Sequence, residues 1–125
     1  MINSSRYASR SGSGALDCWT ASAISIGELT AGLERLPEGK RRRGLERAFR
    51  FLREDYSGRI LDFTEGAAVE WGRLIAEAER GGRKLSVLDS QIESIALHFG
   101  LIVVTRNGAD FFNPVFNPWE AASPQ

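Results

Sequence analysis

The sequence predicts an α/β fold in which a short parallel sheet lies between layers of helices. Two observations lead to this prediction. Short apolar and β-branched runs alternate along the chain with amphipathic segments of helical period. The run at 101–104 is continuously apolar, as is typical of parallel strands covered on both faces. At 125 residues the chain fits one domain, which we expect at 15–120, with a flexible leader at 1–14 and a tail at 121–125.

The composition limits the possible functions. The 16 basic and 16 acidic residues cancel, so no global charge attracts the chain to nucleic acid or to a membrane. No apolar run approaches the ~20 residues that a membrane span requires. The single Cys18 excludes an intramolecular disulfide. Together these features predict a soluble protein of the reducing cytoplasm.

The first strand and helix are predicted at 19–24 and 25–36. Ser25 is the expected N-cap of this helix, and Glu28 then has the position that completes a capping box. That arrangement would give Glu28 a purely structural role. The alternative is that Glu28, just after the end of a strand, points to the sheet edge at which α/β proteins bind ligands.

A second, amphipathic helix is predicted at 40–55. Its first residues, 40–43, form the strongest local positive cluster of the sequence. We interpret the cluster as the solvated face of a helix, and contact with phosphate groups is the alternative. A short strand at 59–63 follows, and then a helix that is capped by Thr64 and runs to about Arg80.

The stretch at 85–110 contains the strongest signal of a functional site. A helix capped by Ser86 is predicted to end at Gly100, and a strand and a polar loop come next. Asp89 lies in the first turn of that helix, and Asp110 follows the strand. Both acids are therefore expected at the edge of the sheet where ligands bind.

Other chemistries lack the necessary residues. One cysteine and one histidine, His98, cannot complete a zinc site, and the sequence contains neither a P-loop nor a GxGxxG motif. What remains is a set of acids at the ends of strands, which repel each other unless a cation binds between them. Hard oxygen ligands suit Mg²⁺ or Mn²⁺. Glu28, Asp89 and Asp110 are therefore candidate metal ligands.

Three stretches resemble the PIN-domain family, and more narrowly its VapC- and FitB-like toxins. They are SAISIGEL at 22–29, LDSQIESIALHFGLIVVTRNGADF at 88–111 and VFNPW at 115–119, the last a predicted short strand. The resemblance implies a PIN-like α/β/α fold with clustered acids that bind Mg²⁺ or Mn²⁺ and cleave RNA as an endoribonuclease. It also implies a small DNA-binding antitoxin as partner, and a homodimer.

The resemblance assigns roles residue by residue. Glu28 matches the acid of the family's S-x-x-x-x-E-L segment. Asp89 matches the acid that opens the family's D-x-x-I-A helix, and Asp110 matches the acid after T-R-N. All three are then catalytic residues as well as metal ligands. Thr105 and Asn107 match loop positions that support the site.

The sequence departs from the family pattern at its start. The family opens with a central strand ending in L-D-T-N, whose Asp is a metal ligand. Here Asp17 directly precedes the strand at 19–24, so it is not equated with that ligand, and the first family strand is expected to be missing. Glu93 replaces a small residue of the family and is expected to add negative charge to the site.

Three hypotheses follow. The first is a metal-dependent endoribonuclease toxin. The second is a truncated, catalytically impaired PIN-like module that mainly binds an antitoxin or dimerises. The third is a small-ligand-binding α/β domain whose acids serve only as helix caps.

Overall fold

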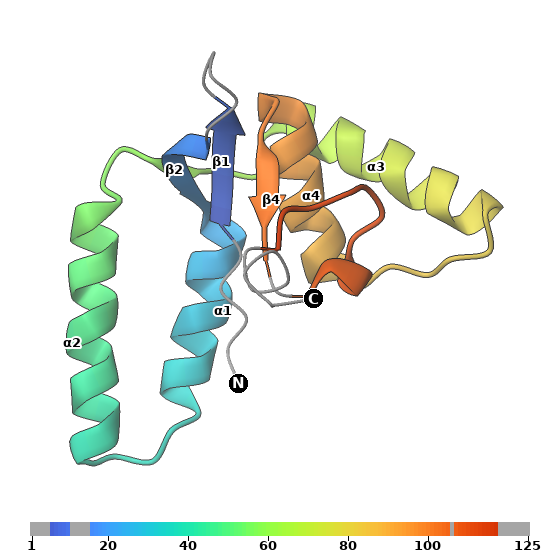
Figure 1. The fold of residues 1–125 in the computed structure, drawn as a ribbon. Coiled ribbons are helices and arrows are strands. Elements are labelled where there is room, and N and C mark those ends of the chain that lie inside the picture. The colour runs from blue at the N-terminus through green and yellow to red at the C-terminus, as the bar shows by residue number, and fades with distance from the viewer. Residues whose placement is uncertain (1–5, 11–15, 106, 118–125) are drawn as a thin grey trace, which may run out of the picture.

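The computed structural model describes residues 6–10, 16–105 and 107–117 (Figure 1). An α/β fold is confirmed. In chain order its elements are β1 (Arg6–Arg10), β2 (Leu16–Ser22), α1 (Ala23–Glu34), α2 (Lys40–Asp55), β3 (Ile60–Leu61), α3 (Glu65–Arg80), α4 (Val87–Phe99), β4 (Ile102–Val104) and the 3₁₀ turn η1 (Gly108–Asp110). Within the described part of the chain, no helix is both long and apolar enough to cross a membrane.

The sheet is mixed, which corrects the prediction of a parallel sheet. Its strand order is β3-β2-β1-β4, with β1 antiparallel to both of its neighbours and β2 parallel to β3. The connection from Arg10 to Leu16 is too short for the crossover that parallel neighbours need, so β2 runs back along β1. The direction of β1 therefore follows from the length of its connection.

β1 comes from the segment that the sequence analysis assigned to a flexible leader. For 6–10 that prediction is wrong, whereas the rest of the leader, 1–5 and 11–14, lies outside the described residues. Tyr7 is 1% exposed and Ala8 is fully buried. The Tyr7 hydroxyl donates a hydrogen bond of 2.6 Å to the backbone oxygen of Ile92 in α4. β1 thus occupies the centre of the sheet, where the sequence analysis expected a strand to be missing.

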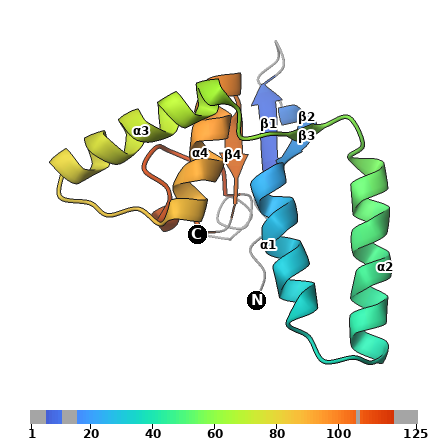
Figure 2. The ribbon, with the colours of Figure 1, turned by 180° about the vertical axis from the view of Figure 1, so that it is seen from behind.

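The main hydrophobic core lies between the sheet and the α3–α4 pair (Figure 2). α4 contributes most to this core because its inward positions are small or β-branched and are buried along most of the helix. The core residues are Tyr7, Ala67, Ile92, Ile95, Ala96, Val103 and Phe111. This packing fixes the start of α4, and with it the position of Asp89.

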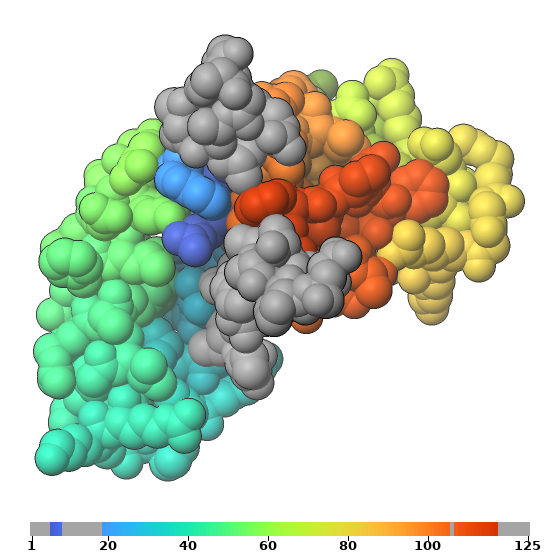
Figure 3. Space-filling model, viewed as in Figure 1, coloured from blue at the N-terminus to red at the C-terminus, as the bar shows by residue number. Residues whose placement is uncertain are grey.

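The predictions for α2, α3 and α4 are confirmed. Thr64 and Ser86 are the N-caps of α3 and α4, and Gly100 ends α4 in the left-handed conformation, with φ of 68°. α2 differs from the other two because it has no buried residue. In Figures 1 and 3 it forms the outer margin of the molecule beyond α1.

The predicted last strand at 115–119 is reduced to a single bridge. Phe116 pairs in parallel with Val104, and the Phe116 backbone N–H donates to the oxygen of Val103 over 3.0 Å. Residues 118 and 119 lie outside the described residues. The bridge brings the segment after η1 back beside β4.

Candidate functional site

Glu28 and Asp89 interact electrostatically although they lie on different helices. α1 and α4 pack against each other, and Glu28 lies on α1 and Asp89 in the first turn of α4. Burial raises the pKa of the Glu28 carboxyl, and the negative charge of Asp89 raises it further. A carboxyl group whose ionisation is opposed by burial and by a nearby carboxylate favours either a bound proton or a neighbouring cation.

Glu28 does not take part in capping α1, so the interpretation of Glu28 as part of a capping box is wrong. The N-cap is Ser22 rather than the predicted Ser25, because β2 runs directly into the helix. The Ser22 Oγ accepts a hydrogen bond of 3.0 Å from the backbone N–H of Ser25. Glu28 lies beyond this first turn, so its half-buried carboxyl group is not explained by the helix end.

Asp89 combines capping with an available oxygen atom. Its backbone N–H donates to the Ser86 Oγ over 3.1 Å, and the Ser86 hydroxyl donates in return to the Asp89 Oδ2 over 2.8 Å. Ser86 is thus the N-cap of the helix, and its hydroxyl group also binds the carboxylate of the third helical residue. It fixes the carboxylate at the start of α4, and among the described residues no donor reaches its other oxygen, Oδ1.

Asp110 does not join Glu28 and Asp89 in a cluster. It ends the η1 turn, and its side chain is exposed. Within residues 6–10, 16–105 and 107–117, no group of three or more His, Cys, Asp or Glu side chains is arranged to hold a metal ion. The three-carboxylate cluster expected from the sequence is therefore replaced by a pair, because η1 projects its acid into solvent. The side chain of Asp17 lies outside the description.

Two side chains of opposite charge hold the backbone around Asp110. The Arg83 guanidinium donates to the backbone oxygens of Ala109 and Phe111, on either side of Asp110. Glu93 accepts hydrogen bonds of 2.7 Å from the N–H of Phe112 and of 2.8 Å and 2.6 Å from the backbone and side-chain N–H groups of Asn113.

Glu93 therefore does not add free charge to the site as expected. Both of its oxygens are used to fix the segment after η1. The sequence analysis gave no role to Arg83. The signal that could have identified both residues is a charged side chain at a buried helix. Arg83 lies just before the start of α4, and Glu93 lies in its middle.

Thr105 and Asn107 hold the loop between β4 and η1. Thr105 is buried, and its Oγ1 accepts a hydrogen bond of 3.1 Å from the backbone N–H of Asn107. This short-range bond turns the chain at the end of β4. The Asn107 side chain is exposed and does not contribute to the core.

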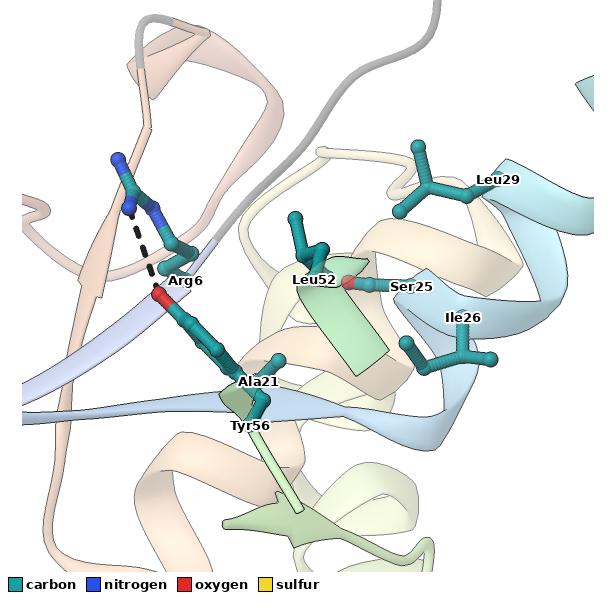
Figure 4. Close-up of a pocket in the computed structure, with 7 residues that line it drawn as sticks. All are labelled: Arg6, Ala21, Ser25, Ile26, Leu29, Leu52 and Tyr56. Atoms are coloured by element: carbon teal, nitrogen blue, oxygen red, sulfur yellow. Dashed lines mark hydrogen bonds between the residues drawn. The ribbon is translucent and has the colours of Figure 1, made fainter. Parts of the chain in front are cut away.

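A cavity of about 280 Å³ lies apart from the acids, between α1, α2 and β1 (Figure 4). The Arg6 Nη1 donates to the Tyr56 hydroxyl over 3.4 Å, as the dashed line in Figure 4 shows. None of the three predicted ligands lines this cavity. Its walls are formed by Arg6, Ala21, Ser25, Ile26, Leu29, Leu52 and Tyr56.

Comparison with known proteins agrees with this arrangement of helices and sheet. A profile described as PIN domain matches residues 5–114. The chain belongs to the PIN-domain family. The match includes β1, so this N-terminal strand belongs to the family domain.

Three curated PIN-domain relatives are similar over most of the chain. The plasmid stability protein StbB of Pseudomonas syringae pv. tomato is 33% identical over 111 residues, which cover 86% of this chain and 80% of the relative. The toxin FitB of Neisseria gonorrhoeae is 34% identical over 102 residues, or 78% and 73%. The VapC ribonuclease Y4jK of Sinorhizobium fredii is 32% identical over 105 residues, or 81% and 75%.

Solved structures of PIN-domain toxins share the fold. The crystal structure of FitAcB from Neisseria gonorrhoeae has a TM-score of 0.74 at 34% identity and covers 80% of this chain and 75% of that one. The structure of FitAB bound to the IR36 DNA fragment has a TM-score of 0.75 at 30% identity and covers 80% and 73%.

Proposed function

We propose that this PIN-domain protein is an endoribonuclease that depends on Mg²⁺ or Mn²⁺ and acts as the toxin of a toxin–antitoxin pair. The single observation that carries the proposal is the Glu28–Asp89 pair, in which the charge of Asp89 on α4 adds to burial in raising the pKa of Glu28 on α1. The names of the relatives support the reaction type, since one is a toxin and another a ribonuclease.

The residues present fit such an ion in a particular way. Mg²⁺ in phosphate-processing sites is commonly bound by one or two carboxylates, together with water and substrate phosphate. Glu28 and Asp89 supply two carboxylates, and the free oxygen of Asp89 is available for a ligand. Asp110 is the third acid of the proposal. The loop that carries it is held by hydrogen bonds of Thr105, Asn107, Arg83 and Glu93.

Each residue then has a defined task. When bound, the ion orients and activates a water for attack on a phosphodiester and neutralises the leaving oxygen. Burial, and to a lesser extent the charge of Asp89, raises the pKa of Glu28, so Glu28 takes up a proton more readily than an ordinary glutamate. A cation between the two carboxyl groups would release that proton. Asp89 is held in place by Ser86 so that the pair does not separate.

Cleavage of RNA in the presence and absence of divalent ions tests the proposal. Asp89→Asn and Asp110→Asn should each lower the rate by about 100-fold or more, because each removes a carboxylate that is proposed to hold the ion. EDTA should abolish cleavage. Asp62→Asn is the matched control, since Asp62 is exposed and lies outside the site. Equal cleavage by all variants, or indifference to EDTA, would contradict the proposal.

The proposed partners are a small DNA-binding antitoxin and a second copy of the chain. The solved relatives include FitAB bound to a DNA fragment, which supports an antitoxin that also contacts DNA. Co-expression with a candidate antitoxin of this kind, followed by size-exclusion chromatography, tests for a stable complex.

The second candidate function is a module that binds an antitoxin or dimerises without catalysis. The observation in its favour is that the described residues bring together two acids rather than three. It predicts a stable complex with the antitoxin and no metal-dependent cleavage by the wild-type chain. The cleavage assay above therefore separates the two candidates.

A further inference from the structure

α2 concentrates positive charge in a chain that is neutral as a whole. Its 16 residues include seven Lys or Arg and three Asp or Glu, a net charge of +4, so the remainder of the chain carries −4. One of the basic residues, Arg42, is neutralised by Glu34, Glu38 and Glu46 at 3.2, 3.5 and 2.6 Å. The others extend from the helix.

Three of these arginines form a row on one face of α2. Arg43, Arg47 and Arg50 follow one another at the spacing of neighbours on a helix surface, and we call them the basic row. Their side chains are exposed, and among the described residues none of them forms an ion pair. The row is therefore an unneutralised strip of charge on the surface of α2.

Phe51 adds an aromatic ring to the basic row. It follows Arg47 by four residues, so the two are neighbours on the helix surface. The Phe51 side chain is 73% exposed, the most of any large hydrophobic residue in the described part of the chain. A ring so exposed to solvent has no function in the core of this domain.

Charge and ring together indicate one kind of partner. Arginines attract the phosphate backbone of nucleic acid, and an exposed aromatic side chain stacks on unpaired bases of any sequence. The Glu28–Asp89 pair repels a polyanion, so RNA must be held by a surface elsewhere. α2 packs against α1, the helix that carries Glu28.

We infer that the basic row and Phe51 form a surface outside the proposed catalytic site that binds single-stranded RNA. The inference rests on the proposed ribonuclease function for the identity of its ligand. The arginines contact phosphates, and Phe51 stacks on a base. Positive charge on one outer helix thereby compensates for the negative charge of the site.

Binding can be measured without cleavage, with a fluorescein-labelled 12-nucleotide single-stranded RNA of mixed sequence and the full chain in EDTA. Arg47→Gln and Arg50→Gln should each weaken binding severalfold and reduce the slope of log affinity against log salt by about 0.7. Phe51→Leu keeps an apolar side chain but removes the ring. It should weaken binding roughly tenfold with no change in the slope.

Matched controls come from the same helix and from duplex RNA. Arg41→Gln removes the same charge on a different face of α2, roughly 200° around the helix from Arg43, and should change affinity least. A duplex of the same sequence should respond to Arg47→Gln but not to Phe51→Leu, because its bases are already stacked. All substituted side chains are exposed, so circular dichroism should show unchanged folding.

Two outcomes would overturn the inference. One is RNA binding that is absent in the wild type or equal in wild type, Arg47→Gln and Phe51→Leu. The other is a Phe51→Leu variant that binds RNA normally and loses self-association on size-exclusion chromatography, which would make this face a protein contact. Failure of the proposed function is distinguishable, because it removes metal-dependent cleavage and leaves these binding constants unchanged.

Discussion

Glu93 shows how the surroundings of a single side chain determine its role. It is 2% exposed, and a carboxylate with so little contact with water must have hydrogen-bond donors around it. It has three, all from Phe112 and Asn113. An acid one turn from Asp89 is therefore a structural anchor for the Asp110 segment and not a further metal ligand.

Glu93→Gln should lower the free energy of unfolding by about 2 kcal/mol. The amide offers one acceptor oxygen, so its NH₂ group faces a backbone N–H that loses its partner in the interior. Urea denaturation measures the change. Glu77→Gln, at an exposed position of α3, is the matched control. An unchanged denaturation midpoint for Glu93→Gln would show that the anchor is unnecessary.

The raised pKa of Glu28 predicts how stability depends on pH. Burial and the charge of Asp89 raise the pKa of Glu28 above its ordinary value of 4.5, so ionisation of Glu28 opposes folding. The stability that protonated Glu28 contributes is complete below 4.5 and is lost as the pH rises through the raised pKa. Glu28→Gln should therefore be more stable than wild type at pH 7.

The gain in Glu28→Gln should shrink as the pH falls toward 4.5, where wild-type Glu28 is also largely uncharged. Thermal denaturation between pH 4 and 8 measures it. Asp89→Asn should show a gain of the same sign, because it removes the other half of the repulsion. A gain that is independent of pH would show that the two carboxylates do not interact.

At the scale of elements, the close contact between α3 and α4 depends on a glycine. A Cβ atom on Gly66 would overlap the imidazole ring of His98, so the His98 ring covers the backbone of α3 at this point. Gly66 lies in the first turn of α3, and His98 in the last turn of α4. Contact between these two ends helps to set the angle at which the helices pack.

Gly66→Ala should have opposite effects in two backgrounds. Alanine is the better helix former by up to about 1 kcal/mol, but in the wild type its methyl group must displace the His98 ring. In a His98→Ala background the ring is absent, and Gly66→Ala should stabilise the protein. A double-mutant cycle by urea denaturation gives the coupling. Equal effects in both backgrounds would mean that the ring moves aside freely.

The sequence predicts α2, α3 and α4 correctly because helices depend on local signals. Thr64, Ser86 and Gly100 mark helix ends, and the apolar period marks the faces. β1 could not be predicted in this way. Tyr7 and Ala8 of this strand are buried, but the extended conformation of 6–10 depends on the partners at 16–20 and 102–104.

The candidate site was predictable in part for the same reason. Resemblance to the family identified Glu28 and Asp89, whose positions are fixed by the helices that carry them. The position of Asp110 depends on a loop, and that loop is held by Arg83 and Glu93, which are distant from it in sequence. Such long-range contacts leave no local pattern that would predict them.

At the scale of the whole molecule, the acid pair predicts that divalent ions stabilise the fold. An ion that binds only the native state raises the unfolding free energy by about 2.7 kcal/mol at 100 times its Kd. Titration with Mn²⁺ should therefore raise the Tm of the wild type by several degrees, and that of Asp89→Asn and Glu28→Gln much less. No shift with millimolar Mn²⁺ would favour acids that serve only the helices.

The central position of β1 also determines when the sheet can form during synthesis. Residues 6–8 pair with 102–104, so β1 obtains its second neighbour only when nearly the whole chain has left the ribosome. Until then it has β2 alone, and an isolated two-stranded hairpin is marginally stable in water. Contacts so distant in sequence form slowly. Completion of the sheet is therefore a late folding step, and the nascent chain carries an open hydrogen-bonding edge that attracts other chains or a chaperone.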